Sequence, residues 1–447
     1  MNYLKPRLSL LGFLEFAVWG SYLVSLGLFL NSVGLGSHTF WFYTVQGLVS
    51  LLMPGLIGIV ADRYIPAQKT FSICHVLAGG FMIAAGWYAM HAGSDIEFGP
   101  LFALYTCSVA FFMPTIGLNN SVAFNALTKA GMDTVKTFPP IRMWGTVGFI
   151  CAELFVNFVH IGGQPIMNTY WQLITSGVIS LALAAYVLTM PPCPVNRGDK
   201  GNVSLADSLG LKAFKLFKRH DMAVFFIFSM LLGVALQITN SYGTMFIEQF
   251  KNVPQYADDF FASNSTFLIS LSQCSEALCI LLIPICLRKL GIKGVMLMAM
   301  LAWVLRFGFF GLGNTSMSGV WLLMLSCIVY GVAFDFFNVS GGLYVDSQTT
   351  PEVRSSAQGL FMIMTNGIGA SVGTWLAGTF IINHNVFAPG LDAVQQLDGW
   401  RTSWFIFAGY ALVVAVLFMI CFHPRREEKE KPTPAQVKVA EDEDNLI

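Results

Sequence analysis

The segment PPCPVNRGDKGNVSLADSLGLKAFKLFKRH, residues 191–220, is the longest internal polar stretch of a chain that otherwise consists mainly of apolar runs. Six apolar windows precede this segment and six follow it. A window of about 20 apolar residues is long enough to cross about 30 Å of hydrocarbon as a helix. The segment therefore divides the chain into two halves, each with six predicted membrane spans.

The twelve predicted spans are separated by short polar loops. They cover residues 8–31, 40–61, 70–91, 99–121, 140–160, 169–190, 221–247, 264–287, 294–313, 319–344, 358–382 and 402–422. The fold class expected from this pattern is an all-α membrane protein with twelve transmembrane helices in two pseudo-symmetric six-helix bundles. The expected parts are an N-terminal bundle (1–190), a cytoplasmic central loop (191–220), a C-terminal bundle (221–423) and a charged cytoplasmic tail (424–447).

The composition agrees with a membrane protein and excludes several other classes. Of 447 residues, 55% are hydrophobic and 11% are charged, whereas about a quarter of the residues of a soluble domain are charged. The net charge is zero and no basic face is evident, so we expect no nucleic-acid partner. Nine single cysteines lack disulfide or metal spacing, and we interpret them as small buried apolar side chains.

The N-terminus and the basic residues predict the orientation. The first apolar run follows a basic start, as in a signal peptide, but it is too long, contains Glu15 and lacks a small-residue cleavage site. We interpret it as a retained first span. With the N-terminus inside, 21 of the 25 lysines and arginines fall on the cytoplasmic side, as the positive-inside rule requires. Both termini are therefore expected in the cytoplasm.

The two halves contain an internal repeat at a spacing of about 225 residues. SVAFFMP (108–114) aligns with GVAFDFF (331–337), and the loop at Asp62-Arg63 aligns with Arg288-Lys289. Two matches at nearly one offset indicate a duplicated six-plus-six architecture. In such proteins the substrate site lies where the two repeats meet, near the membrane midplane.

Polar and ionisable side chains recur inside the predicted spans, where they are costly and therefore indicate function. On four spans they stand at helical spacing, so those of one span share a face. The candidates are Arg142, Thr146 and Phe149 in the fifth span, Gln237 and Asn240 in the seventh, Gln273 and Glu276 in the eighth, and Tyr330, Phe334, Asp335 and Asn338 in the tenth.

This set suits an uncharged polar ligand that has both hydroxyl groups and an aromatic face. Aromatic rings offer a stacking surface, and amides and carboxylates bind hydroxyl and ring-nitrogen groups. A nucleoside has all these features, whereas a sugar has only the hydroxyl groups. Two structural alternatives stay open: the amides can hydrogen-bond neighbouring helices as packing contacts, and Arg142 can pair with an acid for assembly alone.

Two acids and one cation of this set are candidates for proton coupling. Burial favours the protonated form of a carboxylate, and a nearby cation favours the charged form, so a conformational change can bind and release a proton. Glu276 and Asp335 are the candidate carriers and Arg142 the candidate movable partner. The sequence does not distinguish between the two acids.

Other charged residues inside or beside the spans have weaker patterns. Glu15 and Glu153 have no polar companions at helical spacing, so structural pairing and function are equally open, and Arg306 is expected to pair with an acid across helices. GIVADRYIPAQK (58–69) ends the second span. Its residues Gly58, Asp62 and Arg63 form either a cytoplasmic gating latch or an ordinary loop charge pair.

Enzyme and receptor functions find no support in the motifs. The chain has no HExxH, nucleophile elbow, P-loop or glycine-rich nucleotide fingerprint, and its seven histidines are dispersed. We therefore expect no catalytic residue, no metal site and no cofactor apart from the coupling proton. An ATP-driven pump would need a soluble nucleotide domain, which the short loops cannot hold. A receptor would usually carry a sensing or signalling domain, and we expect none in this chain.

The chain resembles the bacterial nucleoside:proton symporter family of the major facilitator superfamily. The resembling stretches are MPTIGLNNS (113–121), AGMDTVKTFPPIRMWGTVGFI (130–150), FFIFSMLLGVALQITN (225–240), SQCSEAL (272–278) and VYGVAFDFFNVSG (329–341). The resemblance covers nearly the whole chain except the tail, and the loop at Gly58–Arg63 looks like the general signature of the superfamily.

The resemblance implies nucleoside import driven by the proton gradient, by alternating access, in the bacterial inner membrane. It also implies a shared binding cavity for the candidates named above apart from Asn338. The expected partners are a nucleoside, protons and the lipid bilayer, and we expect a monomer. Ala235 stands where an acid is common in the family, and the stretch TNSYGTMF (239–246) and Glu153 also differ. A xanthosine-type or sugar-type facilitator of the same superfamily therefore stays an alternative.

Overall fold

The computed structural model describes residues 3–193, 211–349 and 351–424. Within this described part, nine helical stretches are long and apolar enough to cross a membrane. Most of the predicted central loop and all but the first residue of the predicted tail lie outside the described residues.

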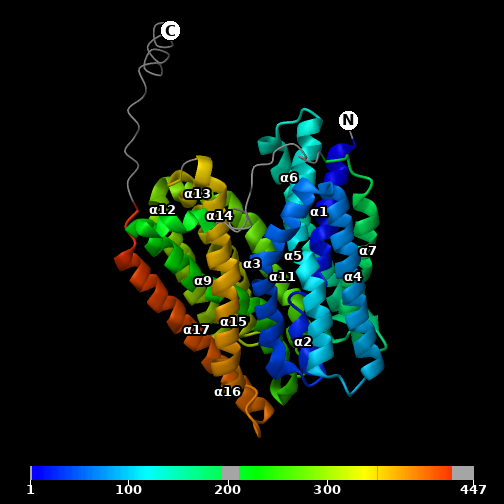
Figure 1. Cartoon of the computed structure of the whole chain (residues 1–447). Coiled ribbons are helices and arrows are strands. Elements are labelled where there is room, and N and C mark those ends of the chain that lie inside the picture. The colour runs from blue at the N-terminus through cyan, green and yellow to red at the C-terminus, as the bar shows by residue number, and fades with distance from the viewer. Residues whose placement is uncertain (1–2, 194–210, 350, 425–447) are drawn as a thin grey trace, which may run out of the picture.

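The first half of the chain forms a bundle of helices with one short hairpin, which we call the N-bundle (Figure 1). Its elements are α1 (Leu4–Gly20), α2 (Leu26–Ser32), η1 (Gly36–His38), α3 (Thr39–Arg63), α4 (Ala67–Ala92), α5 (Phe98–Lys129), α6 (Thr134–Phe158), β1 (His160–Ile161), β2 (Gln164–Pro165), η2 (Ile166–Asn168) and α7 (Trp171–Val187). The two strands pair antiparallel, with His160 opposite Pro165.

The second half forms the C-bundle, which contains two π-helical segments. Its elements are η3 (Leu211–Lys218), α9 (His220–Gln249), η4 (Phe250–Asn252), η5 (Pro254–Tyr256), α10 (Phe260–Ser263), α11 (Ser265–Cys279), η6 (Ile280–Leu282), α12 (Ile283–Leu312), α13 (Val320–Ser347), α14 (Pro351–Met362), η7 (Ile363–Gly369), α15 (Ala370–Leu376), η8 (Ala377–Ile382), α16 (Asn383–Asn385) and α17 (Ala393–Cys421). The segments η7 and η8 are the π-helical ones.

Helices lie along all twelve predicted spans, and one detail differs from the prediction. The first span is not continuous, because a turn separates α1 from α2. The eighth and ninth predicted spans are separate, because the helical stretch Ser265–Leu312 is broken at Gly291. The chain changes direction at Gly291, where φ is +65°, a conformation that glycine adopts without a steric penalty.

Close helix packing places the fifth span against the first. In the N-bundle α6 packs along α1, and α4 packs against α5 and α7. A Cβ atom at Gly148 of α6 would collide with the carbonyl oxygen of Phe13 in α1, and one at Gly20 would collide with that of Phe149. The two backbones therefore approach closely along their length, and this contact fixes the position of the polar face of α6.

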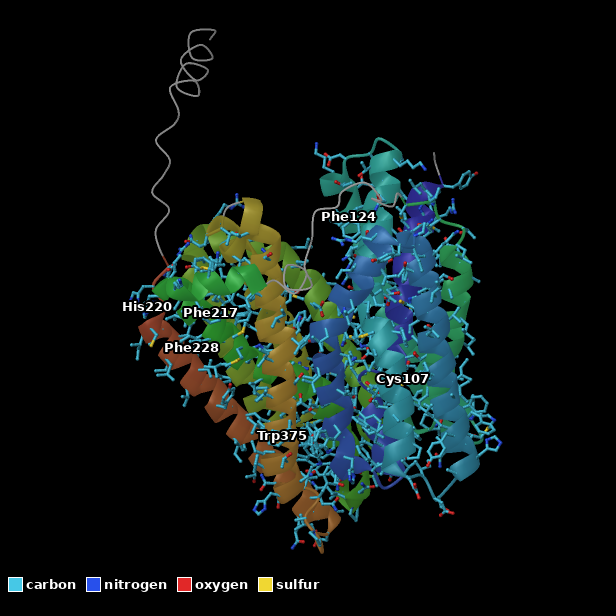
Figure 2. All side chains as sticks on the ribbon, viewed as in Figure 1. Cys107, Phe124, Phe217, His220, Phe228 and Trp375 are labelled. Atoms are coloured by element: carbon cyan, nitrogen blue, oxygen red, sulfur yellow. The ribbon has the colours of Figure 1, made fainter. Side chains whose placement is uncertain are left out.

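The two bundles contact each other mainly through α2, α3 and α6 on one side and α9, α11, η7 and α15 on the other. Hydrogen bonds join them where α3 begins and α9 ends: Asn157 Nδ2 donates to Asn264 Oδ1 at 2.8 Å, and Asn383 Nδ2 donates to the Ser37 carbonyl at 3.0 Å. In Figure 1 the bundles converge toward α2 and α16 and diverge toward the end where α1 begins and α17 ends. Figure 2 shows His220, the first residue of α9, nearer that diverging end than Trp375 of α15.

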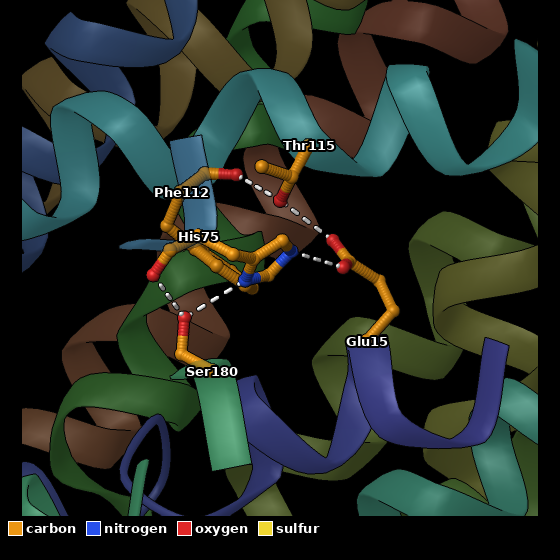
Figure 3. Close-up of polar contacts among 5 residues, drawn as sticks. All are labelled: Glu15, His75, Phe112, Thr115 and Ser180. Carbon is orange, nitrogen blue, oxygen red and sulfur yellow. Dashed lines mark hydrogen bonds and ion pairs between the residues drawn. The ribbon is translucent and has the colours of Figure 1, made fainter. Parts of the chain in front are cut away.

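A buried polar cluster ties four helices of the N-bundle together (Figure 3). Nε2 of His75 on α4 lies 2.8 Å from Oε2 of Glu15 on α1, and both side chains are 0% exposed. The Thr115 hydroxyl of α5 donates to the other oxygen of Glu15 at 2.7 Å, and His75 Nδ1 lies 2.8 Å from the Ser180 hydroxyl of α7. These contacts support structural pairing, which is one of the two interpretations of Glu15 that the sequence left open.

The cysteines depart in part from the sequence interpretation. All nine are free; Cys74, Cys193, Cys279 and Cys327 are buried, but Cys107, Cys151, Cys274 and Cys421 are exposed on the surface of the protein. The interpretation as buried apolar side chains was wrong for these four, because an apolar residue in a membrane span can face outward from the bundle as well as inward.

Candidate substrate site between the bundles

The N-bundle contributes one polar face of α6 to the candidate site. The guanidinium carbon of Arg142 lies 4.1 Å from the centre of the Phe16 ring on α1. One turn further on, Thr146 is half-buried, and Phe149 is buried with its ring edge-on to Trp19 at 6.3 Å. The predicted face is thus present on α6, and α1 supports it from behind.

The C-bundle contributes two hydrogen-bonded amides from α9. Asn240 Nδ2 donates to Gln237 Oε1 at 3.3 Å, and Gln237 Nε2 donates to Gln46 Oε1 of α3 at 3.0 Å. The second of these bonds crosses from one bundle to the other. Gln46 was not predicted from the sequence, because it stands in an apolar span without a second charged or amide residue at helical spacing.

The pair on α11 lies where this helix packs against α6 of the other bundle. Gln273 is buried, and its Oε1 has no hydrogen-bond partner among the described residues. Glu276 is half-buried and interacts electrostatically with Arg142. An amide oxygen and a carboxylate are therefore available as acceptors on this side of the site.

The residues on α13 combine an aromatic pair with an acid. The rings of Tyr330 and Phe334 stack with their centres 5.6 Å apart and their planes at 17°. Asp335 is buried, and its Oδ2 has no hydrogen-bond partner among the described residues. Asn338 donates to the Phe334 carbonyl at 3.0 Å in its own helix, which supports the packing interpretation for this amide.

The charges from the two bundles converge. Arg142 interacts electrostatically with Glu276, with Glu15 of its own bundle and with Asp335, and Glu276 and Asp335 interact with each other. Among the described residues, no carboxylate lies within direct ion-pair distance of Arg142. One cation of the N-bundle thus interacts with one acid of its own bundle and with two acids of the C-bundle, and none of the described carboxylates is in direct ion-pair contact with it.

Two other charged groups lie close to this set. Arg306 was expected to pair with an acid, and that expectation was wrong for the described residues: its guanidinium donates to the Ser272 hydroxyl at 3.2 Å and to the Ser326 carbonyl at 2.9 Å, and it lies 4.3 Å from the centre of the Tyr330 ring. Glu153 on α6 is 0% exposed and neither of its oxygens has a partner among the described residues. It interacts electrostatically with Glu276.

The residues of the predicted gating motif lie apart from this set, at the end of α3. Gly58 is half-buried in the last turns of this helix, and Arg63, also half-buried, is its final residue. The side chain of Asp62 lies outside the part of the chain that is described in detail. The motif therefore keeps the status of a prediction.

The arrangement is compatible with a secondary transporter. Amides, a stacked aromatic pair and opposite charges lie on helices of two bundles, and carriers of this architecture bind a polar solute between their two repeats. Within the described residues, no cluster of three or more histidine, cysteine or acidic side chains is placed to hold a metal ion.

Comparisons with known proteins agree with this class. The family model described as "Nucleoside H+ symporter" matches residues 1–427. The xanthosine permease of Escherichia coli K12 is 43% identical over 418 residues, which cover 93% of this chain and 95% of the permease. The nucleoside permease NupG of the same organism is 39% identical over 421 residues, which cover 94% and 96%. The crystal structure of NupG superposes with a TM-score of 0.84 at 40% identity and covers 95% of this chain and all of that one.

The chain belongs to the nucleoside H+ symporter family. It is a multi-pass membrane transporter and not an enzyme. The predicted fold class, an all-α membrane protein of the major facilitator type, is confirmed by the likeness to the NupG structure. Proton coupling follows from the family as a class property.

Proposed function

We propose that this protein imports purine and pyrimidine nucleosides together with protons across the bacterial inner membrane, as a monomer with both termini in the cytoplasm. The observation that carries this proposal is that α6, which holds Arg142, packs against α11, which holds Glu276, and that Arg142 interacts electrostatically with Glu276 and Asp335 of the C-bundle. Charged groups that belong to different bundles change their separation when the bundles move, and a carrier needs such a dependence to couple a proton to transport.

The nucleoside site in this proposal has two chemically distinct sides. The stacked rings of Tyr330 and Phe334 offer an aromatic surface for the base. The amides of Gln237, Asn240 and Gln273 offer donors and acceptors for the ribose hydroxyls and the base edge. Thr146 and Phe149 of α6 would complete the site from the N-bundle.

The coupling proton in this proposal is carried by Glu276 or Asp335. Both acids interact with Arg142, so approach or separation of the bundles changes how firmly each carboxylate holds a proton. A nucleoside that hydrogen-bonds to either acid would make proton binding and substrate binding interdependent, which is what symport requires.

Alternating access follows if residues 1–190 and 221–423 move as two units. Hydrogen bonds join the two bundles at the end of the molecule where α3 begins and α9 ends. They support a state in which this end of the carrier is closed and the opposite, cytoplasmic end is open. Gly58, Asp62 and Arg63 lie at that opposite end of α3, where a latch could close the carrier to the cytoplasm.

The choice of nucleoside is tested by competition. Uptake of labelled uridine is measured in cells that lack their own nucleoside carriers and express this chain, with unlabelled adenosine, xanthosine or ribose in excess. The proposal predicts inhibition by adenosine and none by ribose. Inhibition by xanthosine alone would favour a xanthosine-type carrier, and inhibition by ribose would favour the sugar-type alternative.

A further inference from the structure

Gln46 is a buried glutamine of the N-bundle, and its side chain contacts the proposed substrate residue Gln237 of the C-bundle. It lies in α3 and is 3% exposed. Its Oε1 accepts a hydrogen bond from Nε2 of Gln237 at 3.0 Å. The same Gln237 accepts from Asn240, so three side-chain amides form one row in which each donates to the next.

The row ends at Gln46, whose amide N–H groups donate no hydrogen bond to a described residue. Nε2 of Gln46 is buried and has no hydrogen-bond partner among the residues that the structure describes. A buried donor without an acceptor destabilises a protein and is rare in native structures. At a membrane-buried interface between two bundles, such a donor points to an acceptor that a ligand supplies.

The backbone around Gln46 is held firmly, so its side chain has a limited reach. Thr44 Oγ1 donates to the Ser371 carbonyl of the C-bundle at 3.4 Å. At Gly47 an added Cβ would collide with the Ser371 hydroxyl. This tight contact between α3 and α15 fixes the amide of Gln46 beside Gln237.

We propose that Gln46 is a further substrate-binding residue, whose Nε2 donates to an exocyclic oxygen of the nucleoside while its Oε1 stays bonded to Gln237. This inference rests on the proposed function and deepens it. The nucleoside would then be held by amides from α3 and α9 at once, so that it bridges the two bundles. Gln46 would contribute to the choice of substrate, because a ligand without a suitably placed oxygen would leave its donors unmet.

The test measures nucleoside binding to purified protein. The dissociation constant of uridine is compared for wild type, Gln46→Met and the control Gln68→Met. Gln68 is also a buried glutamine of the N-bundle, but its Oε1 accepts from the backbone of Cys193. We expect Gln46→Met to weaken uridine binding about tenfold, as loss of one buried hydrogen bond does, and Gln68→Met to leave it within twofold of wild type.

The contact itself is assigned with uridine analogues in which one exocyclic oxygen at a time is replaced or removed: 2-thio-, 4-thio-, 2′-deoxy-, 3′-deoxy- and 5′-deoxyuridine. For one analogue, wild type and Gln46→Met should bind equally well, because the acceptor is already absent. An equal penalty for all five analogues, or no penalty for uridine, would overturn the proposal. If Gln46→Met does not fold, Gln46→Asn, which keeps the amide on a shorter stem, is judged by the same two criteria.

Failure of this inference differs from failure of the proposed function. A wild-type protein that binds neither uridine nor any other nucleoside would refute the proposed function. A wild-type protein that binds uridine, together with an unaffected Gln46→Met variant, would refute only the role of Gln46.

Discussion

The guanidinium carbon of Arg142 on α6 lies over the aromatic ring of Phe16 on α1, 4.1 Å from the centre of that ring. Phe16 follows Glu15 directly, and Glu15 is bound to α4 and α5 in the interior of the N-bundle. The ring that contacts Arg142 thus belongs to a helix that is hydrogen-bonded within the interior of the N-bundle.

Replacement of Phe16 by leucine should weaken transport, because it removes the ring from beneath Arg142. A cation–π contact contributes about 0.5–2 kcal/mol, so we expect gradient-driven nucleoside uptake to fall by roughly two- to thirtyfold. Phe16→Tyr, which keeps a ring, should retain most of the uptake. Phe111→Leu on α5 is the control, since its ring packs against Phe81. Equal uptake by Phe16→Leu and wild type would show that the ring does not position the cation.

Replacement of Glu276 by glutamine should separate binding from coupling. Glutamine keeps the size and a hydrogen-bonding oxygen but cannot carry a proton, so nucleoside exchange between the two sides of a vesicle should continue. Accumulation driven by a pH gradient should fall at least tenfold if this acid carries the proton. Glu97→Gln, at an exposed position before α5, should accumulate nucleoside as wild type does. Normal accumulation by Glu276→Gln would leave Asp335 as the carrier.

Loss of His75 should destabilise the N-bundle without a direct effect on substrate contacts. His75→Phe leaves the buried Glu15 without its nitrogen partner, and a stranded buried group costs about 2–4 kcal/mol. We expect a lower unfolding temperature of the detergent-solubilised protein. The double variant with Glu15→Leu should lose less stability than the sum of the two single variants, because they remove the same interaction. If the losses of stability in the two single variants add up to the loss in the double variant, the interaction between His75 and Glu15 does not contribute to stability.

The close approach of α1 and α6 gives a prediction with a matched control. Gly148→Ala places a methyl group against the carbonyl of Phe13, whereas the same change at Gly80 on α4 meets open space. We expect Gly148→Ala to lower both the unfolding temperature and uptake, and Gly80→Ala to be neutral or stabilising by about 0.5–1 kcal/mol. A Gly148→Ala protein as stable as wild type would imply that the two helices can move apart freely.

Much of the fold could be predicted from the sequence, because span length and apolar composition depend on the bilayer and not on tertiary detail. The second predicted span, 40–61, became α3 (Thr39–Arg63), and the seventh, 221–247, became α9 (His220–Gln249). The π-helical segments η7 and η8 within the eleventh span were not predicted. The segment η7 packs against α9 and α3, and η8 packs against α3 and α17, so these segments depend on contacts with distant parts of the chain that the local sequence does not reveal.

The sequence predicted those candidate site residues whose burial in a membrane costs free energy. Arg142, Glu276 and Asp335 could be singled out because a buried charge needs a reason. Gln46 and Phe16 could not, since their partners Gln237 and Arg142 stand far away in sequence or on another helix. A lone amide or one phenylalanine among 39 gives no local signal.

The central claim, that this chain couples nucleoside entry to protons, is tested most directly in proteoliposomes that contain only the purified protein. The interior is buffered near neutral pH and the exterior is made acidic, and the internal concentration of labelled uridine is followed over time. We predict uridine accumulation above the external concentration while the gradient lasts, and its loss when a protonophore is added. Uridine uptake that only equilibrates, at the same rate and level with and without the gradient, would contradict the claim.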